Sequence, residues 1–235
     1  MTAVAATLFR RVRAWYAGFA ILLAVVVAVI AALVAASGSL TTSAWLLGSA
    51  STVKWFVGPT AIMLIPVYLR QYVSLGVTRR QFLGGGLLFS LGSAGVAALY
   101  TMAGFGVERL VFGAAGLMDG LTEPYPVHSA GSAAAVLVRA FLIYLAHICS
   151  GWLLGAAFYR FGPFGGLVLI PPAVLPALGS EVFFGSEWSV VHPVTVAGVE
   201  LSFAASALLT VALVLAGAVV VHAFGRSVAI RGKIT

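Results

Sequence analysis

Apolar residues fall along the chain in long blocks, separated by short stretches of polar and charged residues. Each block is close to the length that a helix needs to cross a bilayer core of about 30 Å at a rise of about 1.5 Å per residue. An earlier start of the second block, near Trp45, also fits the pattern. We expect one all-α integral membrane domain over residues 1–235. The six predicted transmembrane helices are 14–36, 55–69, 82–107, 133–158, 164–180 and 201–223.

Residues 1–13, before the first block, mix apolar and basic side chains. Leu8, Phe9 and Val12 alternate with three arginines, which predicts an amphipathic helix lying at the cytoplasmic interface. The block 14–36 is longer than the roughly 7–15 residues of a signal-peptide core, so we expect a retained helix.

Composition agrees with a membrane protein, since 62% of the residues are hydrophobic and 8% are charged. A soluble domain has about 25% charged residues. The net charge of +7 comes from short basic clusters beside the apolar blocks. That placement indicates membrane orientation and argues against nucleic-acid binding.

The charges predict that both termini are cytoplasmic. With the N-terminus inside, ten basic residues face the cytoplasm, and Lys54, Arg109 and Arg139 face outward. All six acidic residues then lie outside: Glu108, Asp119, Glu123, Glu181, Glu187 and Glu200.

Small residues and prolines inside the blocks predict how the helices pack. The glycines of 82–107 and the pair Gly151 and Gly155 predict close helix contacts. Pro171, Pro172 and Pro176 predict that helix 164–180 is kinked or interrupted near mid-membrane. Such a break either marks a transport pathway or is a plain kink satisfied by its neighbours.

Two ionisable side chains fall inside helix 133–158. His147 lies near mid-membrane, where we favour a neutral histidine bonded to a neighbouring helix over a functional group. Arg139 either reaches the outer interface or lines a polar vestibule with Glu108 or Glu181. The single cysteine, Cys149, excludes an intrachain disulfide.

No motif predicts catalysis by this chain. The sequence contains no HExxH, no GxSxG and no phosphate-binding loop, so we assign no catalytic residue, metal ligand or nucleotide site.

The stretch 68–82 predicts a short helical extension, a tight turn and a new helix on the cytoplasmic side. Gly76 is suited to a left-handed helix stop, and Thr78 with Gln81 fits a capping box. This would leave Tyr72 and Leu75 available to a partner protein. An ordinary short loop that obeys the positive-inside rule explains the same residues equally well.

This stretch resembles the first cytoplasmic loop of permease subunits in ABC exporters of the type-2 class. Arg70 is followed by Gly76-Val-Thr-Arg-Arg-Gln-Phe82, and the layout of six helices with both ends inside is also similar. The resemblance covers the whole chain in architecture and Arg70–Phe82 in motif.

The resemblance implies a permease subunit in a prokaryotic plasma membrane, paired with an identical or sister permease. A separate ATPase subunit would bind ATP and magnesium and dock on the loop, while this chain binds no cofactor. The residues expected to contact that ATPase are Arg70, Tyr72, Gly76, Thr78, Arg79 and Arg80. Candidate pathway residues are His147, Arg139, Pro171 and Pro172.

Two other classes remain open. One is a carrier or channel that works without ATP, although few acidic residues inside the membrane argue against proton coupling. The other is a non-transporting scaffold, or an enzyme that uses His147 or His128.

Overall fold

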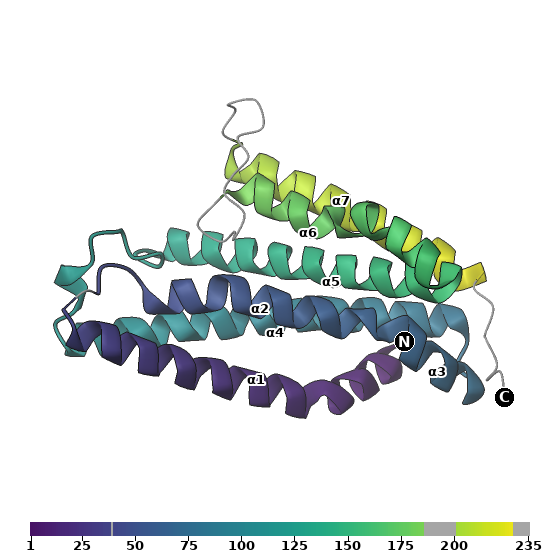
Figure 1. The fold of residues 1–235 in the computed structure, drawn as a ribbon, viewed down its shortest axis with the longest axis horizontal. Coiled ribbons are helices and arrows are strands. Elements are labelled where there is room, and N and C mark those ends of the chain that lie inside the picture. Colours follow the sequence, from purple (N-terminus) through teal and green to yellow (C-terminus); the bar gives the residue numbers. More distant parts are fainter. Residues whose placement is uncertain (39, 186–200, 228–235) are drawn as a thin grey trace.

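The computed structural model describes residues 1–38, 40–185 and 201–227. Most of these residues are helical, and none of them lies in a strand. Figure 1 shows the helices lying lengthwise beside one another. The elements are α1 (Thr2–Ala36), α2 (Ala44–Ile62), the π-helix η1 (Leu64–Leu69), α3 (Arg70–Ser74), α4 (Arg79–Ala114), the 3₁₀ turn η2 (Met118–Gly120), α5 (Ala130–Val168), α6 (Ile170–Phe184) and α7 (Phe203–Ser227). The expected outer segment after α6 and the basic tail fall mostly on residues 186–200 and 228–235, outside the described residues.

Five helical stretches within the described ranges are long and apolar enough to cross a membrane, which makes this a multi-pass membrane protein. They are Thr2–Ala36, Ala44–Ser74, Arg79–Ala114, Ala130–Val168 and Phe203–Arg226. The sixth predicted helix, 201–223, corresponds to α7, and the fifth, 164–180, overlaps α6, which is apolar but only 15 residues long. At about 1.5 Å per residue it is shorter than the bilayer core is thick.

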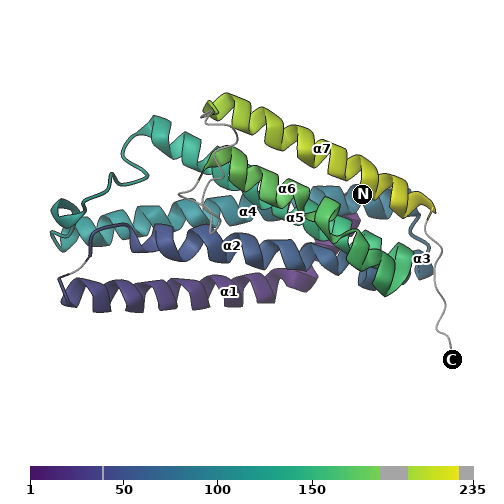
Figure 2. The ribbon, with the colours of Figure 1, turned by 45° about the horizontal axis from the view of Figure 1, so that its top comes forward.

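Helix α5 lies in the middle of the bundle and contacts α2, α4, α6 and α7. Helix α1 packs on α4 and α2 on one side, and α6 and α7 pack together on the other (Figures 1 and 2). The N-terminus, α3 and the end of α7 share one end of the bundle (Figure 1). Arginines gather at this end, which is therefore the basic end of the bundle: Arg10, Arg11, Arg70, Arg79, Arg80, Arg160 and Arg226.

The first thirteen residues do not form a separate interfacial helix, contrary to the sequence-based expectation. Helix α1 begins at Thr2 and continues unbroken into the apolar block. Leu8 is fully buried, and the ring of Phe9 lies 4.8 Å from that of Phe89 on α4. Glycines of α4 leave the space for α1, because a Cβ atom at Gly85 would collide with Val4 and one at Gly92 with the ring of Phe9.

The second helix begins at Ala44, close to the earlier of the two starts that the sequence allowed, near Trp45. Ser43 caps α2, since its Oγ accepts a hydrogen bond from Leu46 N at 3.0 Å. Lys54 therefore lies inside α2, and its predicted place in an outer segment is wrong.

The glycine pair of α5 makes the predicted close contact. A Cβ atom at Gly151 would collide with the carbonyl oxygen of Gly58, and one at Gly155 with that of Ile62. The α5 backbone thus rests directly on the α2 backbone, as small residues allow in membrane helices.

The expected interruption of the fifth predicted helix, 164–180, is present, because α5 ends at Val168 and α6 begins at Ile170, with Leu169 between them. Pro171 and Pro172 occupy the first turn of α6, where a helix needs no donated N–H bond, and both are exposed. Helix α6 continues past Pro176 to Phe184. The chain bends earlier, at Gly162, where φ is +75° and ψ is −173°.

Candidate functional site

The turn between α3 and α4 is built as the sequence predicts. Gly76 takes the left-handed φ of +83°, and Val77 N donates to Tyr72 O at 3.0 Å. Thr78 Oγ1 then accepts from Gln81 N at 3.2 Å, while Thr78 N donates to Gln81 Oε1 at 3.0 Å. This reciprocal capping box fixes where α4 starts, so the turn has one defined shape.

The turn presents a mixed basic and apolar surface at the basic end of the bundle. Leu75 is 78% exposed at the tip of the turn, with the exposed Arg70 and Arg80 on either side of it in sequence. Tyr72, expected to be available to a partner, is instead buried with its ring 5.6 Å from that of Phe82. The exposed residues of the turn are Arg70, Gln71, Ser74, Leu75, Gly76, Thr78 and Arg80.

Two contacts tie this turn to helices that are distant in sequence. Arg79 Nη1 donates to the carbonyl oxygen of Arg226 in the last turn of α7 at 2.9 Å. Arg11 Nη1 on α1 donates to Gln71 Oε1 at 3.4 Å. Arg79 is therefore half-buried and engaged within the chain, whereas its neighbour Arg80 is exposed.

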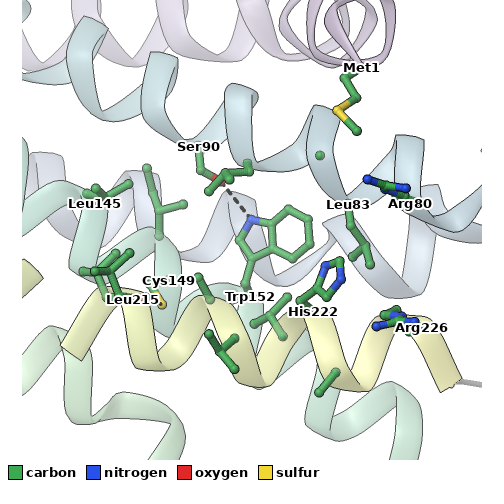
Figure 3. A pocket seen from close by; sticks show the side chains of 18 residues that line it. Met1, Arg80, Leu83, Ser90, Leu145, Cys149, Trp152, Leu215, His222 and Arg226 are labelled. Carbon is green, nitrogen blue, oxygen red and sulfur yellow. Dashed lines mark hydrogen bonds between the residues drawn. The ribbon is translucent and has the colours of Figure 1, made fainter. Parts of the chain in front are cut away.

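A cavity of about 920 Å³ opens between α4, α5 and α7 beside the turn (Figure 3). Its walls are apolar, and the Trp152 indole crosses it to donate to Ser90 Oγ at 3.0 Å. Arg80, His222 and Arg226 lie together at one end (Figure 3) and also line an adjoining cavity of about 490 Å³. The described lining residues include no acidic side chain.

Lys54, His147 and Glu181 meet in the interior of the bundle, one each from α2, α5 and α6. Lys54 Nζ lies 2.9 Å from Glu181 Oε1, and His147 Nε2 lies 3.1 Å from the same oxygen. None of the three side chains is more than 3% exposed. The predicted bond from His147 to a neighbouring helix is present, and its predicted neutral charge stays a prediction.

Glu181 was expected to begin an outer segment, but it lies within α6 and is buried. A buried charge is stable only when it is paired and hydrogen-bonded, which Lys54 and His147 provide. Of the four acidic residues that lie in the described part of the chain, Glu108 and Glu181 are thus buried among the helices.

Pro171 and Pro172, two of the other predicted pathway residues, lie away from the interior cluster, at the exposed start of α6. The guanidinium of Arg139 lies 5.9 Å from the Phe184 ring centroid. None of the four predicted pathway residues lines either cavity at the basic end.

A second polar cluster lies at the opposite end of the bundle, around Glu108 of α4. Its carboxylate accepts from Trp45 N at 2.7 Å, from Tyr125 OH at 3.0 Å and from Ser43 Oγ. Burial, followed by the nearby Glu108 charge, raises the pKa of Tyr125, so its hydroxyl remains a donor at neutral pH. This cluster joins the start of α2 to the loop before α5.

The sequence-based account missed Lys54, Glu108 and Glu181 as buried groups. Ser43 before an apolar run is an N-cap signal that would have started α2 at Ala44 and placed Lys54 inside it. For the two acids we find no comparable signal, because both stand near the edges of apolar blocks.

Comparison with protein-family models, with curated proteins and with solved structures gives no match for this chain. The ABC permease resemblance of Arg70–Phe82 stays a prediction.

Proposed function

We propose that the chain is the membrane-spanning permease subunit of an ATP-driven ABC transporter, energised by a separate ATPase that docks on Arg70–Phe82. The observation that carries the proposal is the turn itself, which is structurally fixed, basic, exposed and tied to α1 and α7. A plain connecting loop needs neither an exposed leucine nor links to two other helices.

The surface of the turn favours an acidic partner with one apolar pocket. Leu75 would fill that pocket, while Arg70 and Arg80 would pair with carboxylates on its rim. Arg79 is not part of this contact, because its guanidinium is bonded to α7.

The same contacts provide a route for movement from the turn into the bundle. A push on the turn acts on α7 through Arg79 and on α1 through Gln71. Arg80 and Arg226 both line the large cavity, so a shift of the turn against α7 changes its basic mouth. The π-helix η1 between α2 and α3 contains Pro66, which has no N–H to donate, and such wide turns are common at functional sites.

The test replaces the exposed face of the turn without touching its internal contacts. A Leu75→Asp, Arg80→Glu double variant should insert normally but lose its ATPase partner and any stimulation of ATP hydrolysis in reconstituted vesicles. Arg13→Glu is the matched control, because Arg13 is also exposed near the basic end but lies outside the turn. The readouts are co-purification of the ATPase from native membranes and its turnover after reconstitution.

If the double variant keeps both the ATPase and its stimulation, or if purified chains transport without a nucleotide-hydrolysing partner, the proposal is wrong. A loss of partner in Arg13→Glu as well would show that general charge, and not the turn, is responsible.

One observation favours a second function, a carrier driven by an ion gradient. The buried Glu181 provides an acidic group in the bundle interior, where the sequence predicted none. Transport into vesicles that continues after ATP is depleted, and stops when the proton gradient is collapsed, would select this function.

A further inference from the structure

The hydrogen bonds of His147 require one hydrogen between its ring and Glu181. Nδ1 lies 2.8 Å from the backbone oxygen of Ile143, and a carbonyl only accepts, so Nδ1 carries a hydrogen. A neutral ring then has a lone pair on Nε2, which points at Glu181 Oε1 from 3.1 Å. Two lone pairs at that distance repel, so the contact holds only with a hydrogen between the two atoms.

We propose that His147 and Glu181 form a proton-binding site, and that the bound proton holds α6 to α5. The hydrogen lies on Nε2 of an imidazolium facing a carboxylate, or on the carboxyl group facing a neutral ring. Both forms have the same number of protons on the His147–Glu181 pair, and this number is the same whether or not Lys54 is charged. The site is independent of any ATPase docking on the turn.

Lys54 connects the same site to a second helix. Its ammonium lies 2.9 Å from the same Glu181 oxygen that faces His147. When the shared proton leaves, the carboxylate is repelled by His147 but still attracted by Lys54. The link between α6 and α5 through His147 is then weakened, whereas the link to α2 through Lys54 is kept.

The groups around the site are defined on each neighbouring helix. Helix α2 contributes Lys54 and the ring of Trp55, which stands edge-on to His147 at 5.4 Å between centroids. Helix α5 also carries Arg139. Its guanidinium lies over the ring of Phe184, which follows Glu181 by three residues on α6.

A second contact shows which part of the α5–α6 interface would stay in place. Ala177 N of α6 donates to Ser150 Oγ of α5 at 3.0 Å. This neutral bond does not titrate, so we expect the first turns of α6 to remain docked while the end that carries Glu181 is held less tightly to α5.

The first experiment measures the proton directly in the unaltered chain. Full-length protein with ¹⁵N-labelled histidine in lipid nanodiscs should show His147 protonated on both ring nitrogens at low pH, and on one at high pH. His147→Gln assigns its signals among the four histidines. The proposal is overturned if His147 carries hydrogen only on Nδ1 at every pH while Glu181, followed by its carboxylate infrared band, is always ionised.

The second experiment measures the consequence for the bundle. Thermal unfolding of the wild type should show a step towards lower stability as the pH rises and the shared proton is released. In His147→Gln the step should vanish, because the amide donates permanently to Glu181. His222→Gln, which replaces the exposed histidine at the cavity mouth, is the matched control and should keep the step. A step that survives in His147→Gln, or that disappears in His222→Gln, would also refute the site.

Discussion

Arg79 donates a hydrogen bond to the backbone oxygen of Arg226, so the first residue of α4 holds the last turn of α7. The carbonyls at the end of a helix have no partner within it, and a cation there also complements the helix dipole. The adjacent Arg80 points into the cavity mouth instead (Figure 3). Arg79 thus makes a contact within the fold, whereas Arg80 lies at its surface.

Arg79→Ala should destabilise the protein by about 1 kcal/mol, because it leaves a helix-end carbonyl without its charged donor. Arg80→Ala should change stability by less than about 0.5 kcal/mol, since its side chain is exposed. Denaturant unfolding in one detergent compares the two variants. Equal losses would mean that the Arg79 contact contributes nothing specific.

Gly151→Ala should destabilise the bundle by about 1–3 kcal/mol, because the new methyl group would push α5 away from the backbone of α2. Gly95→Ala is the control, since a Cβ atom there meets no atom within 4 Å. The measurement is thermal unfolding of both variants. A Gly151→Ala protein as stable as the control would refute the direct backbone contact.

The two glycine sites illustrate what the sequence can and cannot reveal. The GxxxG spacing predicted that α5 makes a close contact, and the capping box at Thr78 predicted where α4 begins, because both depend on residues near in sequence. The α2 partner of Gly151 and the pairing of Lys54 with Glu181 depend on which helices are neighbours in space. No local pattern encodes that choice, so these contacts could not be predicted from the chain alone.

Local patterns also misled where a residue has two structural uses. Pro176 can break a helix interior, yet α6 continues past it to Phe184, and the interruption lies before Pro171 and Pro172. Tyr72 fits an exposed contact residue by type, yet the turn directs its ring onto Phe82.

Glu108→Gln should destabilise the protein by about 1–3 kcal/mol, because an amide offers one acceptor oxygen where Ser43, Trp45 and Tyr125 bring three donors. Glu123→Gln should have little effect, as this exposed side chain accepts one bond from Thr42 at 3.3 Å. Thermal unfolding provides the comparison, and protease sensitivity of 115–129 reports whether the loop before α5 has loosened. Similar behaviour of the two variants would contradict a role for Glu108 in joining α2 to this loop.

Lys54→Met should destabilise the protein by about 3–5 kcal/mol, because it removes a cation from a buried carboxylate. Adding Glu181→Gln should restore part of that loss, since the remaining polar group is neutral. The double-mutant cycle by unfolding should show a coupling energy of more than about 1 kcal/mol. Additive effects would mean that the two side chains do not stabilise each other.

The pairing of Lys54 with Glu181 also has a consequence for biogenesis. The ribosome makes Lys54 more than a hundred residues before Glu181, so the nascent chain carries a buried cation whose carboxylate has not yet been synthesised. Helix α1 contains an apolar block free of charged residues and is suited to insert on its own, whereas α2 would enter lipid with an exposed ammonium group. During synthesis, α2 therefore lacks the Glu181 carboxylate for Lys54 until α6 has been made.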